Sequence, residues 1–123
     1  MKKINLTIAI FIVLVVLGAL FYISKTKKNT PVVIETKLFE IFINKGKLVT
    51  DLGVIHATQG DTVIFKILDD EQEEFHVHGY DKSIEIVKNV PAILTLTANL
   101  TGKFPFELEN SKTELGVLEV EPK

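Results

Sequence analysis

The sequence predicts an all-β sandwich domain preceded by one N-terminal transmembrane helix. Three features of the 123 residues lead to this prediction. A single apolar run lies close to the N-terminus, no long helical period appears after residue 31, and about eight short β-rich segments follow at even spacing. Short strands that alternate with turn residues in this way are typical of β-sandwiches.

The apolar run extends from Ile4 to Ile23. A helix needs about 20 apolar residues to cross a bilayer, and this run has that length. A cleaved signal peptide is the alternative, because Lys2 and Lys3 provide a short positive start. The run is longer than a usual signal core and offers no clean pair of small residues for cleavage. We therefore expect an uncleaved anchor over residues 1–24.

A polar segment, SKTKKNTP, follows the apolar run and ends in Pro31. Its composition is typical of a linker, which we place at residues 25–37. The domain expected after it, over residues 38–123, is acidic. From residue 30 onward the chain holds 9 lysines and 16 acidic residues, a formal charge of −7. Such a domain would repel nucleic acid and attract cations.

The composition also limits the chemistry of the chain. There is no cysteine, and all 14 basic residues are lysine. Disulfides, thiolate metal sites and cysteine nucleophiles are therefore excluded, and so are bidentate arginine clamps. No serine stands in a His–Asp context, and there is no glycine-rich phosphate loop. We therefore do not expect an enzyme.

Turn signals separate the expected strands. Asn44-Lys45-Gly46-Lys47 predicts a hairpin turn, and Gln59-Gly60-Asp61 predicts another. The strands expected in order are residues 38–43, 54–57, 62–68, a histidine strand that ends at Gly79, 83–87, 92–97, 104–108 and 116–120. The first turn leads to a short segment at residues 48–49. Alternation along them predicts a core of Phe39, Ile41, Ile43, Ile55, Val63, Phe65, Ile67, Phe75, Val77, Leu94, Leu96, Phe104, Phe106, Leu108, Leu118 and Val120. Lys103, Pro105, Glu107 and Glu109 are expected on the opposite face of the 104–108 strand.

The histidine strand is the stretch most informative about function. It reads Glu74-Phe75-His76-Val77-His78-Gly79-Tyr80-Asp81 and holds two of the three histidines. Residues two apart in a strand point to the same face, so His76 and His78 share one face and the intervening apolar side chains the other. Two imidazoles on one rigid face are candidate ligands for copper or zinc.

A third ligand is needed for more than weak binding. Glu109, Glu74, Asp81 or a water molecule are the candidates. The alternative interpretation is that the two histidines bind no metal and only set the hydrogen bonding around the Gly79-Tyr80-Asp81 turn. The sequence leaves both interpretations open.

An acidic run, Asp69 to Glu74, connects two expected strands. We expect a solvated hairpin loop, since runs of like charge are normally solvated. The alternative is that this run steers cations toward the histidines. His56 lies between two inward-facing residues and is expected to point to solvent without a ligand role.

Several segments in a fixed order resemble the cupredoxin superfamily, over about residues 38–121. The segments are Gly60-Asp61-Thr62-Val63, the histidine strand, Ala92 to Ala98, Gly102-Lys103-Phe104-Pro105-Phe106 and Gly116 to Val120. More narrowly, Glu74 to Asp81 and Phe106 to Gly116 are similar to stretches of small exported bacterial proteins with a cupredoxin-like domain. The His-x-His-Gly-Tyr-Asp segment is the most specific part of this resemblance.

The resemblance implies a Greek-key β-sandwich that lies outside the cytoplasm. Cupredoxins proper bind one copper through two histidines, a cysteine and often a methionine. By position, the cysteine falls on Leu108 and the methionine close to Leu115, so a type 1 blue-copper centre is excluded. The resemblance therefore implies that His76 and His78 are the surviving half of such a site.

Two functions follow as expectations. The first is a single-pass, membrane-anchored, extracytoplasmic cupredoxin-like module, non-catalytic, that binds copper weakly through His76 and His78. The second is a metal-free structural or interaction domain that docks onto a membrane-protein partner. Neither function involves nucleic acid.

Overall fold

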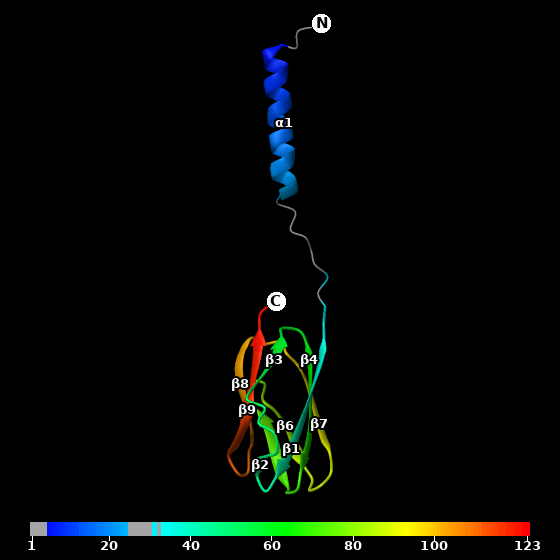
Figure 1. Cartoon of the computed structure of the whole chain (residues 1–123), viewed down its shortest axis with the longest axis vertical. Helices are drawn as coiled ribbons and strands as arrows, with labels where there is room; N and C mark the ends of the chain where they lie inside the picture. Colours follow the sequence, from blue (N-terminus) through cyan, green and yellow to red (C-terminus); the bar gives the residue numbers. More distant parts are fainter. Residues whose placement is uncertain (1–4, 25–30, 32) are drawn as a thin grey trace. The chain divides into compact units, whose positions relative to one another are not determined.

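The computed structural model describes residues 5–24, 31 and 33–123 of the chain (Figure 1). The chain divides into two units, residues 1–32 and residues 33–123, which are described separately. In the first unit, helix α1 spans Leu6–Ser24. Within the described residues, no helix combines the length and the apolar character that crossing a membrane requires. The structure therefore does not support the transmembrane helix that the sequence predicts.

The predicted linker falls mostly on residues 25–30 and 32, which lie outside the described residues. The first strand of the second unit begins at Thr36, inside the range that was assigned to the linker. The limits of anchor, linker and β domain stay predictions.

The second unit is a sandwich of two β-sheets, as the sequence predicts (Figure 1). One sheet has the strand order β2-β1-β4-β7 and the other the order β3-β9-β8-β5-β6. The strands are β1 (Thr36–Asn44), β2 (Lys47–Leu48), β3 (Val54–Thr58), β4 (Thr62–Asp69), β5 (Glu73–Val77), β6 (Lys82–Ile86), β7 (Ala92–Thr97), β8 (Gly102–Leu108) and β9 (Thr113–Glu121). Two pairs are parallel, β1 with β4 and β3 with β9, and the others are antiparallel.

Alternation along the strands places the core between the two sheets. In β7, for example, Ala92, Leu94 and Leu96 are buried while the three residues between and after them are exposed. At the centre, the rings of Phe65 and Phe75 have centroids 5.2 Å apart, and Phe106 lies 5.3 Å from Phe65 and 5.7 Å from Phe75. These three fully buried rings join β4 of one sheet to β5 and β8 of the other.

The expected core agrees closely with the buried residues. Phe39 and Phe104 differ, since they are only partly buried and pack against the core from its edge. The sequence did not point to Ile86 or Leu115, which are buried as well. Leu115 lies in β9 next to the irregular register between β8 and β9, where simple alternation does not identify the inward side chains.

The acidic run is not the fully solvated loop that the sequence predicts. Asp69 is only 1% exposed and Glu73 only 8%. The reason is that Asp69 ends β4 and Glu73 begins β5, so each continues the inward-facing positions of its strand. The Glu71 N–H donates to Asp69 Oδ1 at 3.0 Å, but burial dominates and raises the pKa of the Asp69 carboxyl.

Candidate metal centre

Strand β5 and the residue that follows it place the two candidate histidines on the outer face of the five-stranded sheet. Phe75 and Val77 are fully buried, so His76 points away from the core, as expected. His78 follows the end of β5, and its N–H donates to the Pro105 carbonyl at 2.9 Å, which continues the pairing with β8. The two imidazole rings lie with centroids 4.6 Å apart and planes inclined by 39°.

Glu107 of strand β8 and Glu109, which follows its end, supply two carboxylates to the same face. In the antiparallel register His76 lies opposite Glu107, and the Glu109 N–H donates to the Glu74 carbonyl at 2.7 Å. Each histidine contacts the carboxylate diagonal to it. His76 Nδ1 lies 3.2 Å from Glu109 Oε2, and His78 Nε2 lies 3.1 Å from Glu107 Oε1. Diagonal neighbours on a sheet are within reach of side chains of this length.

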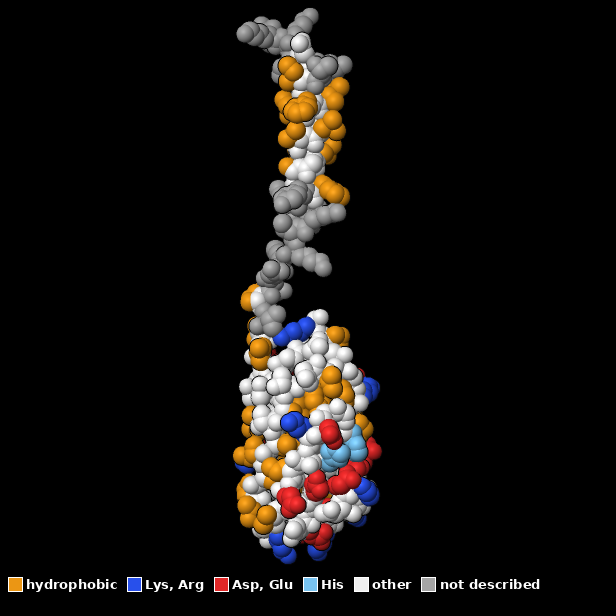
Figure 2. Space-filling view, turned by 180° about the vertical axis from the view of Figure 1, so that it is seen from behind, with side chains coloured by type: hydrophobic (Ala, Val, Ile, Leu, Met, Phe, Trp, Pro, Cys, Tyr) orange, Lys and Arg blue, Asp and Glu red, His pale blue; other side chains and the backbone are white. Residues whose placement is uncertain are grey.

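Glu109 is ionised over the whole neutral pH range. Its second oxygen forms an ion pair with Lys112, and this bond together with the contact to His76 lowers the pKa of Glu109 to about 2. Figure 2 shows the histidine side chains on this face, bordered by acidic side chains. A negatively charged border favours a cation near the imidazoles.

Three of these side chains converge as a metal site requires. His76, His78 and Glu109 each offer one ligand atom, and the three atoms lie within 4.8 Å of one another. All three residues are partly buried, so a bound ion would keep an open side toward solvent. Two imidazole nitrogens and one carboxylate oxygen suit Cu²⁺ or Zn²⁺.

Among the third ligands that the sequence suggested, Glu109 is the one that joins the two histidines. Asp81 is fully exposed, and its Oδ1 lies 3.9 Å from His76 Nε2, outside the converging group. Glu74 does not belong to that group either. The contact of Glu107 with His78 was missed, although the outward face expected for β8 already contained this residue. Only the register of β5 against β8 shows which carboxylate meets which imidazole.

The positions of the side chains contradict the expectation that the two histidines are the surviving half of a blue-copper site. Leu108 lies opposite Phe75 and is fully buried, and Leu115 is buried as well. His76 and His78 lie on the other face of the same sheet. Because neighbouring residues in a strand point to opposite faces, side chains at Leu108 and at His76 could not ligate one ion.

His56 points to solvent, as expected. It is exposed on β3, and its Nδ1 lies 3.7 Å from Glu119 Oε2 across the pairing with β9. It is not part of the converging group. His56 is therefore a suitable control position for experiments on the two paired histidines.

Two sheets with this strand order around an aromatic core define a cupredoxin-like β-sandwich. Solved structures with a similar fold support this class. A copper-binding protein in its apo form aligns with a TM-score of 0.57 at 11% identity, over 70% of this chain and 88% of the other. The copper nitrite reductase of Nitrosomonas europaea aligns with a TM-score of 0.53 at 19% identity, over 73% of this chain but only 42% of the reductase chain.

A third similarity extends over almost the whole chain. A chain from a heme-copper terminal oxidase dimer aligns with a TM-score of 0.55 at 15% identity, over 94% of this chain and 96% of the other. At these identities the similarities establish the fold alone. Neither the models of protein families nor the curated proteins give a match to this sequence.

Proposed function

We propose that this chain is a non-catalytic, cupredoxin-like module that binds copper through His76, His78 and Glu109. The observation that carries the proposal is the convergence of three ligand atoms within 4.8 Å. Glu109, ionised at neutral pH, provides the negative charge that two neutral imidazoles lack. With such a donor set, Cu²⁺ binds more tightly than the other divalent metals of the first transition row. The absence of cysteine makes this site different from a blue-copper centre.

The proposal includes a location. The N-terminal segment holds the chain at the membrane as a single-pass anchor, and the β domain lies outside the cytoplasm. The apolar run from Ile4 to Ile23 supports this part. Lysines flank the run on both sides, at positions 2, 3, 25, 27 and 28. Protease protection of the β domain in intact cells would argue against an outside location.

Titration of the full chain with Cu²⁺ tests the copper site. The wild-type chain should bind one equivalent, and the double variant His76→Ala/His78→Ala should bind at least about a hundredfold more weakly, because two of three ligands are lost. Isothermal titration calorimetry and the Cu²⁺ electron paramagnetic resonance spectrum provide the measurement. His56→Ala is the matched control, since it removes an exposed histidine outside the site, and it should leave the affinity unchanged. Identical binding by the wild-type chain and the double variant would refute the assignment.

A second function, docking onto a membrane-protein partner, has an observation of its own. The outer face of the four-stranded sheet exposes large apolar side chains, with Leu38 and Ile93 both 58% exposed and Phe42 44% exposed. Exposed apolar side chains gathered on one face are typical of contact surfaces. The near-complete alignment with a chain of a heme-copper terminal oxidase dimer is consistent with a domain that associates with other chains.

Site-specific crosslinking in native membranes tests this docking. A photoreactive residue in place of Phe42 should give one discrete adduct of higher mass, because Phe42 lies on the apolar face. The same residue in place of Glu85, which is exposed on β6 of the other sheet, should give none. Equal adducts at both positions, or background alone at both, would contradict a specific partner on this face.

A further inference from the structure

Glu107 contacts the proposed copper site but is not one of its three ligands. Its Oε1 lies 3.1 Å from His78 Nε2, and its side chain is only 19% exposed. Two atoms that each bind one ion at about 2 Å lie about 3 Å from one another. The contact of Glu107 with His78 has this spacing, and so does the 3.2 Å contact that joins His76 to the third ligand. The Glu107 carboxylate therefore lies where a further ligand of the same ion would lie.

An exposed pair on the same sheet shows how this contact differs from an ordinary surface contact. His56 Nδ1 and Glu119 Oε2 lie 3.7 Å apart. Among the described residues, neither belongs to a converging group of ligand atoms. The carboxylate of Glu107, in contrast, approaches an imidazole that has a second imidazole beside it, with ring centroids 4.6 Å apart.

An irregularity in the sheet affects the direction of the Glu107 side chain. The register of β8 against β9 shifts between Phe106 and Glu107, so that β9 has one residue more than β8 at this point. Bulges of this kind re-aim side chains and occur often beside functional sites. The bulge is also closely packed, because a Cβ on Gly116 would lie 2.7 Å from the Phe106 ring. The backbone that carries Glu107 is therefore held in place by its surroundings.

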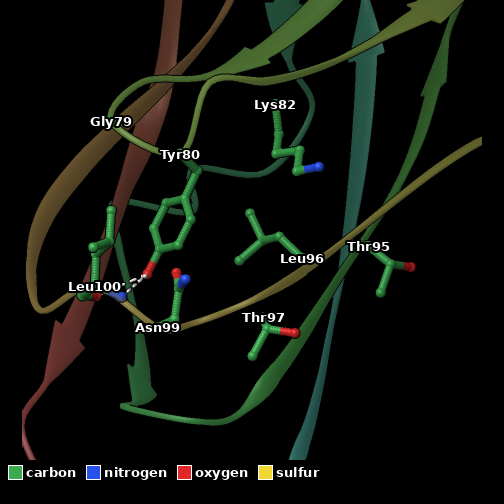
Figure 3. A pocket seen from close by; sticks show the side chains of 8 residues that line it. All are labelled: Gly79, Tyr80, Lys82, Thr95, Leu96, Thr97, Asn99 and Leu100. Carbon is green, nitrogen blue, oxygen red and sulfur yellow. Dashed lines mark hydrogen bonds between the residues drawn. The ribbon is translucent and has the colours of Figure 1, made fainter.

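The turn that follows His78 is held in place as well. Figure 3 shows the Tyr80 hydroxyl directed at Leu100. This hydroxyl donates to the Leu100 carbonyl at 2.7 Å and accepts from the Leu100 N–H at 3.2 Å, which connects two loops. Glu107 lies outside the group of atoms within 4.8 Å of one another, so its side chain must turn to reach an ion bound there. Rotation between side-chain rotamers is sufficient for such a movement, and the backbone can stay as it is.

The charge around the site favours a divalent ion. A hydrogen bond with Glu109 raises the pKa of Lys112. The charges of Glu107 and Glu74 raise this pKa further, so three carboxylates act on this one ammonium. Carboxylate oxygens suit hard cations, whereas thiolates and thioethers select Cu⁺. The chain has no cysteine, and its one methionine is Met1.

We propose that Glu107 is a fourth ligand that binds Cu²⁺ and not Cu⁺, at the copper site proposed above and dependent on it. A second anionic oxygen stabilises Cu²⁺, whereas Cu⁺ gains little from a hard carboxylate ligand. Glu107 therefore determines which oxidation state of copper the module retains. By favouring the oxidised ion, it lowers the reduction potential of the site.

Titration of the full chain with Cu²⁺ and, without oxygen, with Cu⁺ tests this role. Glu107→Gln should weaken Cu²⁺ binding about tenfold or more and leave Cu⁺ binding unchanged, each measured by competition with a chromophoric chelator. Tenfold weaker binding of Cu²⁺ alone corresponds to a rise of about 59 mV in the reduction potential. The Cu²⁺ electron paramagnetic resonance spectrum should change too. Glu119→Gln is the matched control, since Glu119 contacts the exposed His56, and it should behave as the wild-type chain does.

The possible results distinguish the role of Glu107 from the copper site itself. If the wild-type chain binds Cu²⁺ and Glu107→Gln has the same affinity and spectrum, Glu107 is not a ligand. Equal weakening of Cu²⁺ and Cu⁺ binding would indicate a structural effect and would overturn the proposal, as would the same loss in Glu119→Gln. A wild-type chain that binds no Cu²⁺ would refute the copper site, and the fourth ligand with it.

Discussion

Replacing Phe65 by alanine should lower the free energy of unfolding by about 3–5 kcal/mol. The Phe65 ring is fully buried in β4 and contacts both Phe75 and Phe106 of the opposite sheet, with centroid distances of 5.2 and 5.3 Å. Its removal leaves a cavity between the two sheets. The paired strands that surround this cavity, β4 in one sheet and β5 and β8 in the other, limit how far the core can collapse. A loss of this size is a large share of the stability of a small domain.

Urea denaturation followed by circular dichroism measures this loss. Phe42→Ala is the matched control, since it removes the same side chain from the exposed face of the neighbouring strand β1. It should cost about 1 kcal/mol or less. If Phe65→Ala cost no more than Phe42→Ala, the aromatic contacts between the sheets would not be the centre of the core.

Replacing Asp61 by alanine should cost about 2–4 kcal/mol. Asp61 is 2% exposed in the turn before β4, and its carboxylate accepts two backbone hydrogen bonds. The Thr58 N–H donates to Oδ2 at 2.9 Å and the Glu35 N–H donates to Oδ1 at 3.1 Å. Without the carboxylate both N–H groups lose their acceptor, and the segment before β1 loses its side-chain hydrogen bond to the turn. Asp61→Asn keeps one acceptor oxygen and should cost less.

The same carboxylate makes stability depend on pH. The hydrogen bonds from Thr58 and Glu35 lower the pKa of Asp61 below its ordinary value. A lowered folded-state pKa means that the contribution is fully present above the unfolded pKa, about 4, and is lost as the pH falls below it toward the folded value. Asp69 acts in the opposite direction, because burial raises the pKa of its carboxyl and protonation therefore favours its folded state.

The difference between the wild-type chain and Asp61→Asn isolates the Asp61 contribution, since Asp69 is present in both. Denaturation midpoints measured from pH 6 down to pH 2 should converge as the pH falls. Asp81→Asn, a change at a fully exposed acid, should show no such convergence. Parallel midpoints for Asp61→Asn across the whole range would contradict the role of this carboxylate.

The β-sandwich could be predicted because period-two alternation is a local property of the chain. The buried positions of β4 and β7, such as Phe65 and Leu94, follow from alternation alone, and so does the shared face of His76 and His78. The Gly60-Asp61 turn was visible for the same reason, because turn residues act on their immediate neighbours. The burial of Asp69 and Glu73 could not be predicted from their charge, which indicates exposure. It follows from the inward-facing position of each residue in its strand.

The sequence by itself determined the class of fold, the faces of the strands, the lack of any thiolate chemistry and the two histidines of the candidate site. Only the tertiary structure decided which carboxylates meet them. Glu107 and Glu109 lie more than 25 residues away from His76 and His78, and their approach depends on the register between β5 and β8. The register between β5 and β8 pairs segments that are about 30 residues apart in the sequence, so no pattern within either strand alone shows which carboxylate meets which imidazole.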